Sequence, residues 1–151
     1  LRDLIVGYRL TPLKYRYGNI DASQTQGFSS FIVWKLTPDL QIRFDHLYTS
    51  AKDLKTGITL LRRPLHKVLA SCQWQITSEH QLNLGLSYDG KQADLMRSPP
   101  YKRVYRTGPL LTRATFNYKP QSIASKYGQP SFFARIENIS DQNYEQPAGY
   151  T

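Results

Sequence analysis

The chain has 151 residues, of which 40% are hydrophobic and 13% aromatic, and a formal net charge of +9. This composition excludes a disordered chain. The mean hydropathy of −0.52, with no apolar run near the roughly 18 residues of a membrane helix, excludes a helical membrane protein. The single cysteine, Cys72, excludes an intrachain disulfide, and the length predicts one domain.

Alternation of apolar and polar side chains predicts β-strands along the whole chain, and no comparable window has the 3.6-residue period of a helix. The second strand is long, and we expect it to be bent or bulged near Gly18 and Gly27. The fold class is therefore all-β, with about seven strands. They are predicted at residues 3–10, 14–36, 40–51, 65–76, 81–90, 109–118 and 130–138.

The connections between these strands alternate in length. Short turns are predicted at residues 37–39 and 77–80, and longer polar loops at residues 52–64 and 91–108. Such an alternation is typical of an antiparallel up-and-down outer-membrane barrel, with tight periplasmic turns and long extracellular loops. The connection at residues 119–129 falls at the end with the short turns but is longer than they are.

Two segments forty residues apart share one pattern: Trp34 is followed fourteen residues later by Tyr48, and Trp74 by Tyr88. A sheet that spans a bilayer places aromatic residues at both interfaces. Packing of these rings in a soluble core is the alternative. On the membrane interpretation, Tyr48 and Tyr88 mark the outer level, and the periplasmic level holds Trp34, Trp74, Tyr118 and Phe132.

The two faces of the predicted strands differ in polarity. Even positions are apolar, although His46 interrupts them, either near the outer interface or at a bulge. Each charged odd position would cost roughly 2–4 kcal/mol near the bilayer midplane, so the even face is predicted to meet lipid and the odd face the lumen. About seven strands cannot close alone, because an open edge in lipid leaves backbone groups unpaired. We therefore expect a transmembrane arc of a larger barrel, wide enough for water or a plug. The polar odd positions include Gln41, Arg43, Asp45, Lys67, Gln73, Gln75, Asn83, Arg113, Asn117, Arg135 and Glu137.

Most of the surplus positive charge falls in two segments, a net +3 at residues 52–63 and a net +4 at residues 91–106. They are interpreted either as solvated loops or as a basic rim that faces anionic headgroups or an anionic ligand. Rings and cations interleave in the second segment. Its candidate ligand-binding residues are Tyr101, Arg103, Tyr105 and Arg106.

Three motifs resemble the TonB-dependent outer-membrane receptors, among them the vitamin B12 (cobalamin) receptor type. Residues 22–28 (Ala-Ser-Gln-Thr-Gln-Gly-Phe) resemble a run that precedes a down strand in that family. Residues 60–66 (Leu-Leu-Arg-Arg-Pro-Leu-His) resemble its entry into the next one. Residues 133–145 (Phe-Ala-Arg-Ile-Glu-Asn-Ile-Ser-Asp-Gln-Asn-Tyr-Glu) resemble its most specific segment, although Ile139-Ser140 replaces the usual Leu-Phe.

The resemblance implies that residues 1–151 are the C-terminal portion of such a receptor barrel, a 22-strand plugged barrel in the bacterial outer membrane, without the plug domain and the closing strand. The whole receptor would import a bulky, scarce nutrient such as a cobalamin or an iron-siderophore. The implied partners are outer-membrane lipid and lipopolysaccharide, the small-molecule nutrient, and the TonB system through the missing plug, with no nucleic acid.

The residues also leave other functions open. A soluble, basic β-sandwich that binds polyanions, either nucleic acid or polysaccharide, is the main alternative. An outer-membrane phospholipase needs a Ser-His pair that no spacing here supports, and no catalytic or cofactor motif stands out, so we expect no enzyme. His46, His66 and His80 are isolated in the sequence, without metal-ligand spacing.

Overall fold

The computed structural model describes residues 2–11, 14–96, 102–123 and 128–143. It confirms the all-β prediction, with antiparallel pairing throughout both sheets. The strands are β1 (Arg2–Thr11), β2 (Lys14–Thr37), β3 (Leu40–Asp53), β4 (His66–Gln75), β5 (His80–Asp89), β6 (Lys91–Leu95), β7 (Arg103–Thr107), β8 (Leu110–Tyr118) and β9 (Phe132–Glu137), with a short 3-10 helix at Gln121–Ile123.

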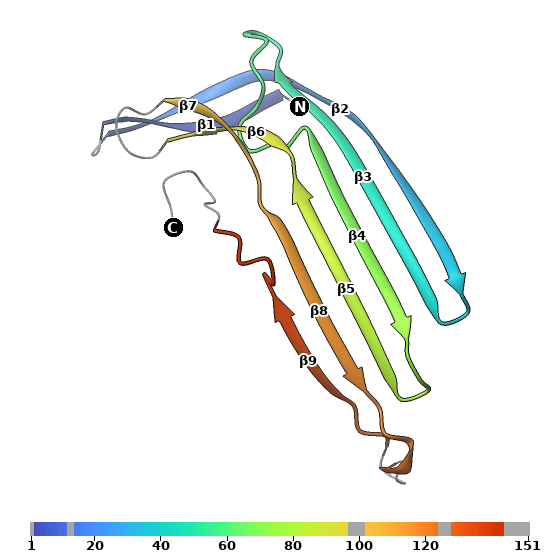
Figure 1. Ribbon diagram of the computed structural model, residues 1–151. Coiled ribbons are helices and arrows are strands. Elements are labelled where there is room, and N and C mark those ends of the chain that lie inside the picture. Colours follow the sequence, from blue (N-terminus) through green and yellow to red (C-terminus); the bar gives the residue numbers. More distant parts are fainter. Residues whose placement is uncertain (1, 12–13, 97–101, 124–127, 144–151) are drawn as a thin grey trace.

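Seven strands form one sheet in the order β1-β2-β3-β4-β5-β8-β9, and β6 and β7 form a separate hairpin. Figure 1 shows β2, β3, β4, β5, β8 and β9 side by side in one layer, while β1 lies beyond one end of it. The first part of β2 pairs with β1, and the part from Ser23 onward pairs with β3. Strands that follow each other in this order are joined at alternating ends, as in an up-and-down sheet.

All seven strands of the large sheet match the predicted ones within about two residues at each end. The prediction of a loop over residues 91–108 was wrong, because β6 and β7 form a hairpin there. Both strands are only five residues long, and neither contains a run of alternating apolar residues long enough to mark a half-buried strand.

β2 was predicted to be bent or bulged near Gly18 and Gly27, and the bulge alternative was wrong. The register runs without a shift through Gly18 and Gly27, and the only shift in the β2–β3 pairing lies between Lys35 and Thr37 at the turn. β2 instead follows a smooth curve over the end of the sheet (Figure 1). The β3–β4 register is equally regular around His46, so no bulge explains that residue on the even face.

The register keeps the two faces separate across the whole sheet. From β2 to β9 every even-numbered residue pairs with an even-numbered one, except beside the β2–β3 turn, where Thr37 pairs with Leu40. Because successive side chains of a strand point to opposite faces, the even positions of six strands share one face. This even face carries Phe28, Ile32, Trp34, Ile42, Phe44, Val68, Ala70, Cys72, Trp74, Leu82, Leu84, Leu86, Leu110, Ala114, Phe116 and Ile136.

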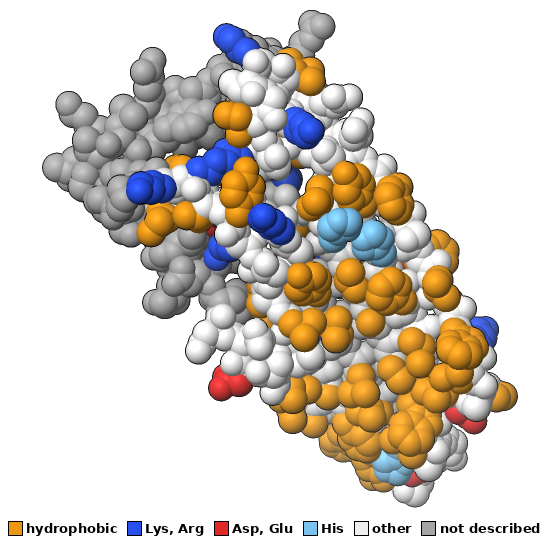
Figure 2. Space-filling model, turned by 45° about the horizontal axis from the view of Figure 1, so that its top comes forward, with side chains coloured by type: hydrophobic (Ala, Val, Ile, Leu, Met, Phe, Trp, Pro, Cys, Tyr) orange, Lys and Arg blue, Asp and Glu red, His pale blue; other side chains and the backbone are white. Residues whose placement is uncertain are grey.

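The even face has no second layer over it in the described part of the chain. Ile32 and Trp34 are 66% and 63% exposed, and where the structure describes side chains, from residue 22 onward outside its gaps, the buried apolar residues are Ala51, Ala93 and Pro120. On the face that Figure 2 shows, hydrophobic side chains cover much of the surface, and most of the visible Lys and Arg side chains lie toward one end. A soluble sandwich would instead cover such a face with a second sheet.

Aromatic side chains gather at both ends of the even face. At the end with the short turns, Trp34 pairs with Ile42, Trp74 with Leu40, and Tyr118 with both His80 and Phe132. At the opposite end, which we call the loop end, Tyr48 pairs with Phe28 and with His66, and Tyr88 pairs with Val68 and Leu110. The rings therefore stand at two heights, as the repeated pattern predicts.

The odd face is mainly polar and carries charges of both signs. Arg43 forms an ion pair with Asp45, Arg135 with Glu137, and Lys67 with its cross-strand partner Asp89 at 3.3 Å. A hollow of about 590 Å³ lies on this face. Its charged lining consists of Arg43, Asp45, Lys67, Arg113 and Glu137.

Candidate functional site

The two basic segments of the sequence fold together at the loop end. Leu61 forms a parallel bridge with Ala93, the Arg62 amide donates to the Ala93 carbonyl at 2.7 Å, and the Leu65 amide donates to the Lys91 carbonyl at 3.0 Å. We call this unit, residues 52–65 together with β6, Lys102 and β7, the loop platform. Its backbone contacts join segments about thirty residues apart, which no local pattern in the sequence indicates.

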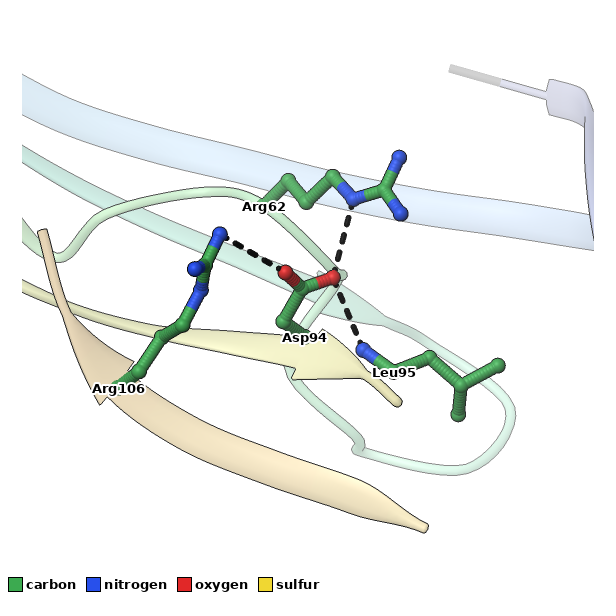
Figure 3. Close-up of polar contacts among 4 residues, drawn as sticks. All are labelled: Arg62, Asp94, Leu95 and Arg106. Atoms are coloured by element: carbon green, nitrogen blue, oxygen red, sulfur yellow. Dashed lines mark hydrogen bonds and ion pairs between the residues drawn. The ribbon is translucent and has the colours of Figure 1, made fainter. Parts of the chain in front are cut away.

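Asp94 is the centre of the loop platform. Its side chain is fully buried, and its two carboxylate oxygens accept from Arg62 Nε and from Arg106 Nη2, each at 3.0 Å (Figure 3). The Leu95 amide donates to the same oxygen as Arg62, at 2.9 Å. Two guanidinium groups and a backbone amide thus compensate the buried charge, which would otherwise be strongly destabilising.

Arg62 adopts a left-handed backbone conformation, with φ of 56°. This region costs a residue other than glycine about 1–3 kcal/mol and persists only where the surroundings impose it. Here the Ala93 carbonyl holds the Arg62 amide and Asp94 holds Nε. Half of the Arg62 side chain nevertheless stays exposed, so the remaining edge of its guanidinium faces solvent.

The four predicted ligand-binding residues separate into groups. Arg103 and Tyr105 are both exposed on one side of β7, with the Arg103 guanidinium 6.0 Å from the Tyr105 ring. Arg106 lies on the other side of β7, where it contacts Asp94 and is only 21% exposed. Tyr101 lies outside the described residues.

Two further residues join Arg103 and Tyr105 at the surface of the platform. The Lys91 ammonium lies 5.3 Å from the Tyr105 ring, so together with Arg103 this ring has two cations in contact range. Arg103 also donates to the Thr59 carbonyl, which links the hairpin to the 54–65 segment. Sequence reasoning missed Lys91 and the burial of Asp94. The one available signal was that Asp94 is the sole carboxylate among the five cations of residues 91–106.

A turn at the end of β3 supports the other side of the platform. Asp53 Oδ1 accepts from the amide of Lys55 at 2.8 Å and from the amide of Thr56 at 3.3 Å. These hydrogen bonds, led by the one from Lys55, hold the pKa of Asp53 below its ordinary value. Asp53 therefore stays ionised at neutral pH, yet its charge is directed into the turn.

The exposed surface of the platform is consequently cationic. Both of its described carboxylates, Asp53 and Asp94, are engaged in internal hydrogen bonds. Such a surface attracts phosphate, carboxylate or other anionic groups, and the ring of Tyr105 adds an apolar contact. The exposed cations are Lys52, Lys55, Arg62, Arg63, Lys91, Lys102 and Arg103.

No known protein family matches the sequence, and no curated protein is significantly similar to it. Among the described residues, no helix is both long and apolar enough to cross a membrane. The same residues contain no group of three or more His, Cys, Asp or Glu side chains that could hold a metal ion.

Proposed function

We propose that the chain forms part of the wall of a TonB-dependent outer-membrane receptor that imports a bulky, scarce nutrient, a cobalamin or an iron-siderophore. The observation that carries the proposal is the uncovered even face, which stays mainly apolar across six strands in a register that shifts only beside the β2–β3 turn. In this proposal the even face meets lipid, the odd face lines the lumen, and the loop platform lies outside the membrane.

The dimensions of the sheet support this arrangement. β4, β5 and β8 are 10, 10 and 9 residues long, and a strand needs about 9–11 residues to cross a bilayer at a tilt. The aromatic residues at the two ends of the even face would lie at the two headgroup levels. The cationic platform would then face lipopolysaccharide and the arriving ligand.

The charges of the odd face support the same orientation. Arg113 and the Arg43–Asp45 and Arg135–Glu137 pairs line or border the hollow on that face. Facing hydrocarbon near the midplane, each charge would cost roughly 2–4 kcal/mol, whereas a hydrated lumen accommodates them readily. The soluble β-sandwich is less favoured, because the described residues place no second sheet over the even face.

Two neighbouring residues test which face meets lipid. Leu84 and Asn83 lie side by side in the middle of β5 and point to opposite faces. In phospholipid bilayers, L84R is expected to lower the free energy of unfolding by about 2–4 kcal/mol. N83R is expected to change it by less than about 1 kcal/mol, because its charge enters the hydrated face.

The measurement is a urea titration, followed by tryptophan fluorescence, of the barrel that contains this chain, reconstituted in vesicles. Quenching by brominated lipids gives an independent reading, because Trp34 and Trp74 would face the acyl chains or their boundary. Equal effects of the two substitutions, absence of quenching, or a monodisperse chain in buffer without detergent would each overturn the proposal.

A further inference from the structure

Among the charged residues that line the hollow on the odd face, only Arg113 forms no ion pair within the described part of the chain. Its cross-strand partner on β9 is Glu137, which forms an ion pair with Arg135 instead. Its partner on β5 is Gly85, and the stem of Arg113 lies across it, because a Cβ on Gly85 would stand 2.7 Å from Nε and 3.0 Å from Cγ. The missing side chain of Gly85 therefore gives Arg113 its place over the sheet.

The other two cations that line the hollow are engaged within the sheet. Arg43 donates to the Asp45 carboxylate from both Nε and Nη2, at 2.8 and 2.5 Å. Lys67 forms its ion pair with Asp89 at 3.3 Å. Three cations and two carboxylates line the hollow, which leaves a net charge of +1. The hollow consequently attracts one negative charge, and Arg113 is the cation that remains to contact it.

The row of residues next to Arg113, on the side of the loop end, adds an apolar surface. Ser87 in β5 lies between its two cross-strand partners, Leu69 in β4 and Leu111 in β8, and all three line the hollow. Two leucines on the otherwise polar odd face thus stand beside a cation. The volume of about 590 Å³ is in the usual range of small-molecule sites, roughly 300–1,000 Å³.

We propose that the hollow binds a small amphiphilic carboxylate, whose charged group contacts Arg113 and whose apolar part rests on Leu69 and Leu111. The guanidinium presents its N–H groups in a planar fork that matches the two oxygens of a carboxylate. A carboxylate also matches the net charge of +1, whereas a phosphate monoester carries about −1.5 to −2 at neutral pH. This site rests on the proposed function in one respect, that the odd face is hydrated.

The test uses benzoate as the probe and the barrel that contains this chain, reconstituted in vesicles. Binding is followed by saturation-transfer NMR of the probe, with protein-free vesicles as the blank. Benzamide keeps the ring without the charge, and acetate keeps the charge without the ring. We expect benzoate to bind more tightly than either, because only benzoate contacts both Arg113 and the two leucines.

Three substitutions examine Arg113. R113Q should weaken benzoate binding at least about tenfold, the loss typical of a hydrogen bond between charged groups. R113K keeps the charge without the fork, so its affinity should lie between those of R113Q and the unaltered barrel. G85A keeps Arg113 itself but puts a Cβ where its stem lies, so binding should weaken while the barrel stays folded.

K35Q is the matched control, because Lys35 is an exposed cation of the same face that does not line the hollow. It lies on β2, three strands away from Gly85 in the sheet, a separation of about 14 Å at the usual strand spacing. This exceeds the Debye length of about 8 Å at physiological ionic strength. K35Q should therefore bind benzoate as the unaltered barrel does.

Three results would overturn the site. Benzamide or acetate could bind as tightly as benzoate, R113Q could bind benzoate as K35Q does, or G85A could leave the affinity unchanged. The proposed function fails on a different result, equal destabilisation by L84R and N83R. Failure of the carboxylate site is thus distinct from failure of the transport proposal.

Discussion

Gly27 and Tyr48 approach so closely that no side chain fits between their strands: a Cβ on Gly27 would stand 2.1 Å from the Tyr48 carbonyl oxygen. The obstacle is backbone, not the tip of a flexible side chain, so it cannot rotate away. A glycine within a long strand is unusual, and here it allows the backbones of β2 and β3 to approach closely.

Gly27→Ala is therefore expected to destabilise the β2–β3 pairing by about 1–3 kcal/mol, the usual cost of an added methyl group in a site without space. The measurement is urea unfolding in detergent or vesicles. Gly85→Ala is the matched control, because a Cβ there would meet only the Arg113 side chain, at 2.7 Å. That side chain can shift, so the control should lose clearly less stability, and equal losses would contradict the steric explanation.

Asp94→Asn removes the charge that both Arg62 and Arg106 contact. Loss of one member of a buried ion pair costs about 3–5 kcal/mol, and the partial exposure of Arg62 places this case near the lower end. The loop platform should open locally while the large sheet stays folded. Hydrogen exchange at the amides of Arg62 and Leu65, which bond to β6, reports this opening.

A second substitution in the same region controls for general loosening of the loops. Asp53→Asn keeps an oxygen that accepts from the turn amides, since asparagine also forms such turns. It should leave the exchange of the Arg62 and Leu65 amides unchanged. If Asp94→Asn also leaves them unchanged, the carboxylate does not hold the platform together.

The turn at Asp53 is expected to depend on pH. Its hydrogen bonds from Lys55 and Thr56 lower the pKa of Asp53 in the folded chain from the ordinary value of 3.8. The contribution to stability is therefore fully present above that value and is lost as the pH falls through the folded pKa. In an NMR titration the Lys55 amide should shift with a midpoint below 3.8, and a midpoint at or above 3.8 would contradict the assignment.

The strands of the large sheet were predictable because alternation is a local signal. Leu82 to Tyr88 shows it in an unbroken run, and the observed β5 agrees with the prediction. The hairpin of β6 and β7 was not predictable in this way. Its one buried carboxylate is Asp94, which stands among cations in the sequence, a pattern typical of a solvated loop. The burial of Asp94 depends on contacts with residues about thirty positions earlier.

The candidate sites show the same limit. Nothing local distinguishes Arg106 from Arg103, because their opposite orientations follow from the strand that the sequence did not reveal. The contact between His46 and His66, whose ring nitrogens lie 3.0 Å apart, follows from the β3–β4 register and not from their spacing in the sequence. Local pattern therefore located the basic region, and long-range pairing decided which of its residues are exposed.

Removing the charge of Arg103 is expected to affect ligand binding, whereas removing that of Arg106 is expected to affect the loop platform. Arg103→Gln removes an exposed cation beside Tyr105, so we expect weaker binding of an anionic ligand or of lipopolysaccharide, with the loop platform intact. Arg106→Gln removes a contact of buried Asp94, so the platform should loosen, with faster exchange at the Arg62 amide.

Binding of lipopolysaccharide to the reconstituted chain and hydrogen exchange separate the two effects. Lys119→Gln, at the opposite end of the sheet, is the charge-matched control and should change neither readout. If Arg103→Gln binds as the unaltered chain does, the exposed face of β7 is a solvated surface and not a ligand contact.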